Sequence, residues 1–335
     1  MIVYTSPKAA TAIPIIDLSG GASGSTADRA RIAAQIRAAC CEIGFFYVTN
    51  HGIDAGLLDA QFAATRQFFA LPLDQKLSIH MKQSPSTAGY EPIGGQWLDS
   101  QDANAEVAPP DVKESYYLGA ELPASHPFVQ ARSRGFGFNQ WPSGLPGFRE
   151  QMLRYQSAVH ELGDALLSLI AQSLEQPDDF FAPFFDTPSE TLRLLRYPPH
   201  PANAQPNQLG AGAHTDWGGI TLLAQDERGG LEVQNVAGDW VDATPVSGTL
   251  VVNLGDLMSR WTNGIYASNM HRVKNNRSAG DRYSIPYFYS PRPDALIKCI
   301  DTCTDGTRAP RFAPVTASEH INEMFRRSYG YAPIA

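Results

Sequence analysis

Apolar residues recur along this chain with two different periods, and each period predicts a different kind of secondary structure. Apolar positions three and four residues apart predict amphipathic helices, whereas short alternating runs predict strands. The helical period holds in segments 27–42, 55–70 and 148–174. The last segment carries one apolar stripe over about seven turns. It therefore predicts a long scaffold helix that lies against a sheet.

Short strands separated by turns dominate the second half of the chain. Runs at 13–18 and 44–53 predict two earlier strands. Later strands are predicted at 192–199, 221–225, 231–234, 240–243, 250–254 and 282–289, with one more around His271. Because turn-separated strands at this spacing indicate two facing sheets, we expect a mainly β protein with flanking helices. Its core would be a double-stranded β-helix, or jelly roll, and the helical period at 318–328 predicts a closing helix.

The stretch 83–140 is polar, rich in Gly and Pro, and only weakly patterned. Such a stretch inside a compact domain is often a lid or a binding loop, so we predict that it contributes to a substrate pocket. Tyr90 and Tyr116 are its candidate pocket walls, and the alternative is that both are ordinary half-buried aromatic residues.

Composition narrows the class of protein without choosing a function. The chain has 335 residues, of which 43% are hydrophobic and 18% are charged, which is typical of a globular protein. We predict one domain over 1–335, in which an N-terminal region of helices and strands (1–182) precedes a jelly-roll core (190–300) and a closing segment (301–335). The chain has a net charge of −8 and no large block of basic residues. Both features argue against a nucleic-acid partner and favour a small-molecule substrate.

The cysteines and the N-terminus add two further expectations. The four cysteines have no metal-binding spacing, so we expect buried or partly buried free thiols. No signal peptide and no membrane span is recognisable, which predicts a cytoplasmic protein that does not enter a membrane. The oligomeric state is left open.

A metal site is the strongest candidate for chemistry. His214 and Asp216 lie two residues apart on a predicted extended segment, so their side chains point the same way. With His271 from a later strand they would form two-histidine, one-carboxylate ligation, which holds Fe(II) and leaves part of its coordination sphere open. Alternation also places Arg282 and Ser284 on one face of a following strand, where they suit a carboxylate.

Together these motifs resemble the Fe(II)/2-oxoglutarate-dependent oxygenases, and more closely their isopenicillin N synthase-like branch. The run 44–53, Gly-Phe-Phe-Tyr-Val-Thr-Asn-His-Gly-Ile, is similar to an N-terminal signature of that branch. The resemblance implies Fe(II) as the cofactor, with 2-oxoglutarate and O2 as cosubstrates. Arg282 and Ser284 would hold the far carboxylate of 2-oxoglutarate, and the hydroxyl of Tyr197 would assist there. The expected reaction oxidises a C–H bond of a small molecule, by hydroxylation, desaturation or cyclisation, while 2-oxoglutarate is converted to succinate.

Several alternatives stay open at this point. Isopenicillin N synthase and aminocyclopropane-carboxylate oxidase share these motifs without using 2-oxoglutarate, and ethylene formation is known for one microbial relative. A non-catalytic, metal-binding jelly-roll module is the alternative from another class. Arg193 and Phe288 are further candidates for the substrate pocket. Arg193 and Arg196 cannot both face it, since positions three apart lie on opposite faces of a strand.

Overall fold

Two β-sheets form the centre of the computed structural model, which describes residues 8–21, 24–96, 109–200, 208–304 and 308–329. In spatial order the larger sheet contains β1 (Ile15–Asp17), β2 (Phe45–Thr49), β10 (Leu250–Leu254), β7 (Ile220–Gln225), β12 (Arg282–Ser290), β5 (Ser189–Tyr197), β4 (Glu114–Gly119) and β3 (Gly89–Glu91). The smaller sheet contains β6 (Ala211–His214), β11 (His271–Val273), β8 (Leu231–Gln234) and β9 (Trp240–Asp242). A separate pair joins β13 (Leu296–Ile297) to β14 (Val315–Thr316).

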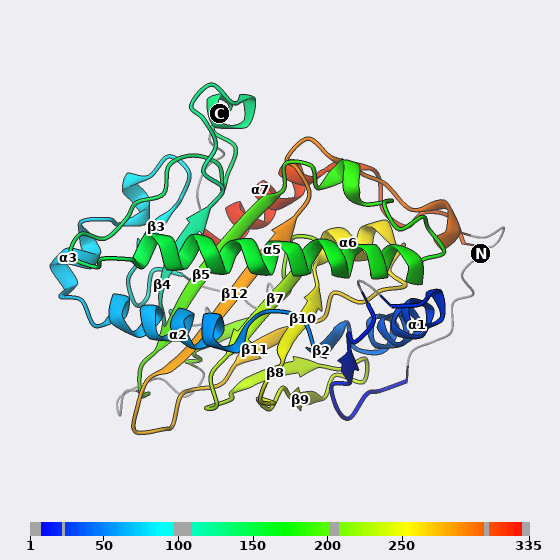
Figure 1. Ribbon diagram of the computed structural model, residues 1–335, viewed down its shortest axis with the longest axis horizontal. Coiled ribbons are helices and arrows are strands. Elements are labelled where there is room, and N and C mark those ends of the chain that lie inside the picture. The colour runs from blue at the N-terminus through cyan, green and yellow to red at the C-terminus, as the bar shows by residue number, and fades with distance from the viewer. Residues whose placement is uncertain (1–7, 22–23, 97–108, 201–207, 305–307, 330–335) are drawn as a thin grey trace.

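Three helices cover the outer face of the larger sheet, and each of them was predicted from the apolar period. They are α1 (Thr26–Glu42), α2 (Ala55–Phe69) and α5 (Phe148–Ser173). Helix α5 crosses the sheet in Figure 1 and buries its apolar stripe against it, with Met152, Val159 and Leu166 fully enclosed. The structure confirms the predicted jelly roll backed by a long helix.

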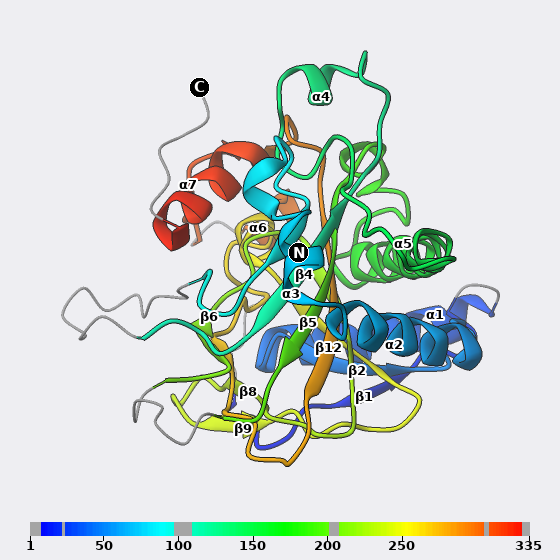
Figure 2. The same cartoon turned by 90° about the vertical axis from the view of Figure 1, so that its left-hand side faces the viewer.

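The inner face of the larger sheet meets the smaller sheet, so the two sheets enclose a second apolar core. Figure 2 shows β6, β8 and β9 on the opposite side of the larger sheet from α1, α2 and α5. Side chains from both sheets pack here, including Leu195, Tyr197, Val233, Val251 and Val273. This space between the sheets is where ligands enter jelly-roll proteins, and the candidate site lies in it.

Seven further helices complete the described part of the fold. They are the α-helices α3 (Leu73–Leu77), α4 (Pro127–Gln130), α6 (Asp256–Trp261) and α7 (Ala317–Tyr329), and the 3-10 helices η1 (Met81–Gln83), η2 (Ala182–Phe184) and η3 (Asp301–Cys303). Helix α7 is the predicted closing helix. In the described part of the chain, no helix combines the length and the apolar character that crossing a lipid bilayer requires. All four cysteines are free thiols, and all are buried or half-buried as expected.

The stretch 83–140 is more regular than its composition suggests. It contributes β3 and β4 to the edge of the larger sheet, where Tyr90 pairs with Tyr116 across the two strands. The assignment of these two tyrosines to a pocket wall is wrong. Tyr90 is 1% exposed and Tyr116 is 0% exposed, because both point to the helix-covered face and pack with Phe68 in the main core. Residues 97–108 of this stretch lie outside the described residues.

Gly44 permits the close approach of two backbone segments beside β2. Its φ is +67°, and a Cβ built on it would lie 2.1 Å from the carbonyl oxygen of Ala267. Gly52 has a similar φ of +81° but no heavy atom within 4 Å of such a Cβ. Both Gly→Ala substitutions carry the cost of a left-handed residue, so Gly44→Ala should lower the free energy of unfolding by about 1–3 kcal/mol more than Gly52→Ala. Urea unfolding of both variants measures this difference, and equal losses would contradict the argument.

His160 on α5 lies half-buried among acidic groups. Its Nδ1 is 3.2 Å from Glu190 Oε2, and its Nε2 is 3.6 Å from Asp164 Oδ2. The hydroxyl of Tyr287 is 3.4 Å from Nδ1, and the ring of Tyr289 packs edge-on at 5.2 Å. The hydrogen bond to Glu190 raises the pKa of His160 above its usual value, although burial opposes it.

This raised pKa predicts a pH-dependent contribution to stability. A group whose pKa is higher in the folded state stabilises the fold fully below its unfolded pKa of about 6.5 and loses that contribution as the pH rises through the folded value. His160→Gln should therefore lower the melting temperature more at pH 6 than at pH 9. Melting curves of both proteins at the two pH values measure this, and an equal loss at both would contradict it.

Candidate metal centre and adjoining cavities

Three side chains of the predicted metal site meet between the two sheets. His214 ends β6, Asp216 follows two residues later, and His271 begins β11 directly opposite His214 in the antiparallel pairing. One ligand atom from each lies within 4.8 Å of the others, and His271 Nε2 is 3.8 Å from Asp216 Oδ1. The two imidazole centroids are 4.3 Å apart, and Phe45 packs edge-on against His271. Sheet pairing therefore brings together residues that are far apart in the sequence.

Hydrogen bonds fix which atoms face the centre of this group. Asp216 Oδ2 accepts from Thr221 Oγ1 at 2.6 Å and from Asn253 Nδ2 at 2.7 Å, which leaves Oδ1 toward the histidines. His214 Nδ1 lies 2.8 Å from the carbonyl oxygen of Gly212, and His271 Nδ1 lies 3.3 Å from that of Asn269. Because a carbonyl only accepts, both Nδ1 atoms carry the proton, and both Nε2 atoms offer a lone pair.

The protonation states of His214 and Asp216 favour metal binding. Burial, together with the neighbouring His271, lowers the pKa of His214 to about 3, so that its imidazole is neutral near pH 7. Burial acts to raise the pKa of Asp216, but the two histidines and the hydrogen bonds from Asn253 and Thr221 outweigh it and lower the pKa. Neutral imidazole and ionised carboxylate are the forms that bind a metal.

The donor set fits an open site for Fe(II). Among the described residues, the cluster that could hold a metal comprises two histidines and one aspartate, and it includes neither a cysteine nor a second carboxylate. A structural zinc site normally has four protein ligands, whereas two histidines and one carboxylate suit Fe(II) with open positions.

Asp256 stabilises the segment that contains Thr215 and Asp216. Its backbone N–H donates to the carbonyl oxygen of Asp216 at 2.8 Å, and its carboxylate accepts from Ser268 at 2.7 Å and from Thr215 at 3.3 Å. His320 on α7 lies 3.5 Å from the same carboxylate. These contacts give Asp256 a structural position next to the metal cluster but not in it.

A narrow cavity of about 70 Å³ runs from the metal cluster into the space between the sheets. Arg282, Ser284 and Tyr197 line it together with the cluster. Arg282 is 2% exposed, its Nη1 donates to Ser284 Oγ at 3.3 Å, and its guanidinium lies 4.7 Å from the centroid of the Tyr197 ring. Its Nε donates to the carbonyl oxygen of Gly229. The predicted alternation on β12 thus directs both clamp residues into one cavity.

Lys113 also lines this cavity and was not among the predicted site residues. It is 4% exposed and forms an ion pair with Asp111, whose carboxylate also accepts the backbone N–H of Gly212 at 2.9 Å. A sequence signal does exist, because Lys113, Ser115 and Tyr117 alternate with the buried Tyr116 and so share the inner face. The weak pattern of the surrounding stretch hides this alternation.

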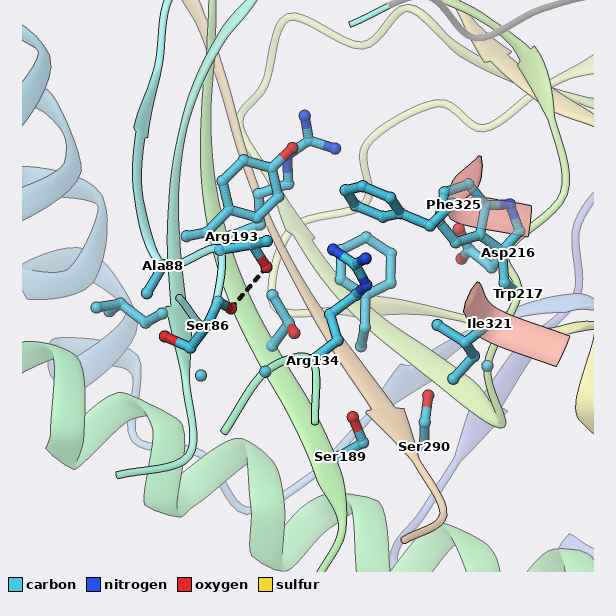
Figure 3. Close-up of a pocket in the computed structure, with 18 of the residues that line it drawn as sticks. Ser86, Ala88, Arg134, Ser189, Arg193, Asp216, Trp217, Ser290, Ile321 and Phe325 are labelled. Carbon is cyan, nitrogen blue, oxygen red and sulfur yellow. Dashed lines mark hydrogen bonds between the residues drawn. The ribbon is translucent and has the colours of Figure 1, made fainter. Parts of the chain in front are cut away.

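A wider cavity of about 170 Å³ also borders the metal cluster, and Figure 3 shows part of its lining. Arg193 and Phe288, both predicted pocket residues, line it and also border the narrow cavity. Arg196 instead contacts Glu114 and Asp281, with its Nε 2.8 Å from Asp281 Oδ2. Alternation along β5 therefore selects Arg193 as the inward arginine.

Other wall residues of the wider cavity were missed by the sequence analysis. Tyr117 lines it in place of the predicted Tyr116, because neighbouring residues of a strand face opposite sides. It is also lined by Trp217, which follows Asp216, by Arg134 after α4, and by Phe325 on α7. The last two lack any local motif, since only the fold brings their segments to the cavity.

Comparisons with known proteins agree with this geometry. Residues 13–144 match the family described as the N-terminal part of non-haem dioxygenases in morphine synthesis, and residues 188–291 match the 2OG-Fe(II) oxygenase superfamily. The chain is 39% identical to the 2-oxoglutarate-Fe(II) type oxidoreductase hxnY of Emericella nidulans, over 97% of this chain and 92% of that protein. It is 37% identical to the 2-oxoglutarate-dependent dioxygenase citB of Monascus ruber, over 97% and 98% of the two chains.

A solved structure supports the same relationship. A full-length Neurospora crassa protein, crystallised in complex with alpha-KG, superposes with a TM-score of 0.80 at 31% identity, covering 93% of this chain and 95% of that one. The family named from the sequence motifs is confirmed, in preference to a non-catalytic metal-binding module. The chain belongs to the 2OG-Fe(II) oxygenase superfamily and is an Fe(II)- and 2-oxoglutarate-dependent dioxygenase that uses O2.

Proposed function

We propose that His214, Asp216 and His271 hold the catalytic Fe(II) through the two Nε2 atoms and Asp216 Oδ1. The observation that carries this proposal is the hydrogen bonding of the side-chain atoms that point away from the proposed metal position. Both Nδ1 atoms face backbone carbonyl oxygens, and Asp216 Oδ2 accepts two side-chain hydrogen bonds. Only the inward atoms are then directed to a metal, and their orientation is set before it binds.

The narrow cavity is the proposed site of 2-oxoglutarate. Its lining by the metal cluster, Arg282 and Ser284 suits a molecule with a chelating keto-acid end and a distal carboxylate. The planar guanidinium of Arg282 would bind that carboxylate with help from the Ser284 hydroxyl, while the Tyr197 ring holds the guanidinium in place. Lys113 adds a second buried cation beside the cavity.

Fe(II) held by His214, Asp216 and His271 would activate O2, which is the oxidant: two electrons would come from conversion of 2-oxoglutarate into succinate and CO2, and two from the substrate C–H bond. The chain positions the reactants and limits the access of water. The wider cavity is the proposed substrate site because His214 and Asp216 border it, and Phe288 and Trp217 give it apolar walls. A small molecule fits its volume.

The proposed catalytic domain extends over the whole chain, 1–335. The cavities draw on the stretch 83–140, on the jelly-roll core and on the closing helix α7. We therefore propose that 83–140 contributes to substrate binding through β4 and the segment after α4.

An anaerobic titration tests the ligand assignment. Adding Fe(II) and then 2-oxoglutarate to the metal-free protein should produce the weak visible absorption band of an Fe(II)–2-oxoglutarate chelate, and admitting O2 should yield succinate. The absence of both the band and succinate would overturn the proposal. Arg282→Met should lose the band at 2-oxoglutarate concentrations that saturate the wild type.

Thr221 provides a test of the outer hydrogen bonds. Thr221→Val keeps the shape of the side chain but removes the 2.6 Å hydrogen bond to Asp216 Oδ2. Loss of a hydrogen bond that orients a metal ligand typically weakens metal binding by ~10–100-fold. Competition with a chromophoric chelator measures the Fe(II) affinity. Thr249→Val is the control, because the Thr249 hydroxyl that it removes donates to the nearby carbonyl oxygen of Val246. Equal Fe(II) affinities of the two variants would contradict the assignment.

A further inference from the structure

Lys113 is a buried cation on the wall of the narrow cavity. It directly precedes β4 and is 4% exposed. Its ammonium group forms an ion pair with Asp111, which is equally buried. The carboxylate offsets the cost of burying the charge, but a buried ion pair is stable only when its remaining donors and acceptors are also satisfied.

Asp111 holds Lys113 beside the strand that carries the metal ligand His214. Asp111 Oδ1 accepts the backbone N–H of Gly212 at 2.9 Å, and Asp111 Oδ2 faces the ammonium group. Gly212 lies in β6, and its carbonyl oxygen is 2.8 Å from His214 Nδ1. One carboxylate and one peptide unit therefore connect Lys113 to His214, and the lysine enters the cavity next to the metal cluster.

The clamp residue Arg282 lies on the other side of Tyr197 from Lys113. In the larger sheet, β5 lies between β12 and β4. Arg282 pairs with Tyr197 across β12 and β5, and Arg196 pairs with Glu114 across β5 and β4. Because Lys113 directly precedes Glu114, about two strand spacings, or roughly 10 Å, separate its backbone from that of Arg282. Two cations placed in this way suit the two ends of a dianion.

The ammonium group of Lys113 can donate further hydrogen bonds. A lysine ammonium carries three N–H donors and no acceptor. Within the described ranges, its hydrogen-bond acceptor is the Asp111 carboxylate. Buried donors are normally satisfied by the protein, by water or by a ligand. The other donors can therefore serve a ligand in the narrow cavity, which Lys113 lines together with His214 and His271.

We propose that Lys113 is a cosubstrate-binding residue that donates a hydrogen bond to the carboxylate at the 2-oxo acid end of 2-oxoglutarate, the end next to the metal cluster. Arg282 and Ser284 bind the distal carboxylate, so that each end of the dianion has its own cation. Asp111 orients the ammonium group. The proposal rests on the proposed function, because it assumes that the narrow cavity holds 2-oxoglutarate.

Two ligands that differ only at the distal end show which carboxylate Lys113 binds. 2-Oxovalerate has a methyl group where 2-oxoglutarate has its distal carboxylate. Anaerobic calorimetric titrations in the presence of Fe(II) give the dissociation constants of both. Lys113→Met should weaken both ligands by a similar factor of about tenfold or more, the loss expected for a hydrogen bond to a charged group. Arg282→Met should weaken 2-oxovalerate by less than about threefold but 2-oxoglutarate far more. Lys82→Met, an exposed change, is the control and should alter neither.

A variant without either charge separates ligand binding from folding. Lys113→Met alone leaves the Asp111 carboxylate buried without its cation, which is expected to destabilise the protein. Combining Lys113→Met with Asp111→Asn removes both charges and keeps a side-chain oxygen that can accept from Gly212. This double variant should melt close to the wild type and bind Fe(II) as tightly when no cosubstrate is present. It should still lose about tenfold or more in affinity for both ligands.

Several results would overturn the proposal. A loss for 2-oxoglutarate alone would place Lys113 at the distal carboxylate, and wild-type affinity of the double variant for both ligands would give Lys113 no role in binding. A parallel loss of Fe(II) affinity would mean that Lys113 acts only by positioning His214. Failure of the wild type to bind 2-oxovalerate would also count against it, since contacts at the 2-oxo acid end would then contribute no measurable affinity. Unchanged affinity of Arg282→Met for 2-oxoglutarate would instead contradict the proposed function.

Discussion

Replacing Asp216 by alanine is expected to abolish succinate formation and to weaken Fe(II) binding by more than about 100-fold. Changes to residues that only orient a metal ligand already cost ~10–100-fold, so loss of a ligand atom should exceed that range. Asp216 is the only carboxylate of the described cluster, and Asp256 cannot replace it because its oxygens accept hydrogen bonds from Thr215 and Ser268. Equilibrium competition for Fe(II) and anaerobic absorption spectra measure the effect.

The effect on stability must be separated from the effect on metal binding. Asp216→Ala leaves Thr221 and Asn253 without their buried acceptor, which should cost ~1–3 kcal/mol of folding free energy. Asp216→Asn retains an oxygen that can accept from both, so it should melt close to the wild type while still losing metal affinity. Asp59→Ala, an exposed change on α2, is the control for both measurements. Wild-type Fe(II) affinity in a folded Asp216→Ala protein would refute the ligand assignment.

The metal cluster and the clamp could be predicted because each depends on strand alternation over two residues. His214 with Asp216, and Arg282 with Ser284, share a direction whenever the backbone is extended, so no knowledge of the tertiary fold is needed. His271 was predicted as the third ligand because two histidines and one carboxylate form an open Fe(II) site when the third residue comes from a later strand. Its position opposite His214 is a property of sheet pairing, which periodicity alone does not reveal.

The walls of the substrate cavity could not be derived in the same way. In β4 the inward residue is Tyr117 and not Tyr116, and a shift of one residue exchanges the two faces of a strand. The weak pattern of 83–140 gave no strand from which to count, so the choice of tyrosine had no support. Arg134 and Phe325 meet only because α7 packs over the cavity, and this contact joins segments far apart in the sequence.

Arg282 should show a second large effect, with opposite consequences for ligand affinity and for the stability of the ligand-free protein. Arg282→Met removes the cation that is expected to bind the distal carboxylate of 2-oxoglutarate. Truncating one partner of a buried, hydrogen-bonded charge pair costs ~2–5 kcal/mol, which is about 30-fold to several thousand-fold in affinity. Arg282→Lys keeps the charge but loses the planar guanidinium, so its affinity for 2-oxoglutarate should lie between those of the wild type and Arg282→Met. Anaerobic titration with 2-oxoglutarate in the presence of Fe(II) measures all three dissociation constants.

The stability of the same variants provides the more discriminating test. Among its described contacts, Arg282 has a carbonyl oxygen, a hydroxyl and an aromatic ring as partners, but no carboxylate, although it is 2% exposed. Burying a cation without a counter-ion is costly, so Arg282→Met should melt at or above the wild-type temperature when 2-oxoglutarate is absent. The wild type should then gain stability on adding 2-oxoglutarate, while the variant gains little at the same concentration. A variant that is strongly destabilised without ligand, yet still stabilised by 2-oxoglutarate like the wild type, would mean that Arg282 supports the fold and does not bind the cosubstrate.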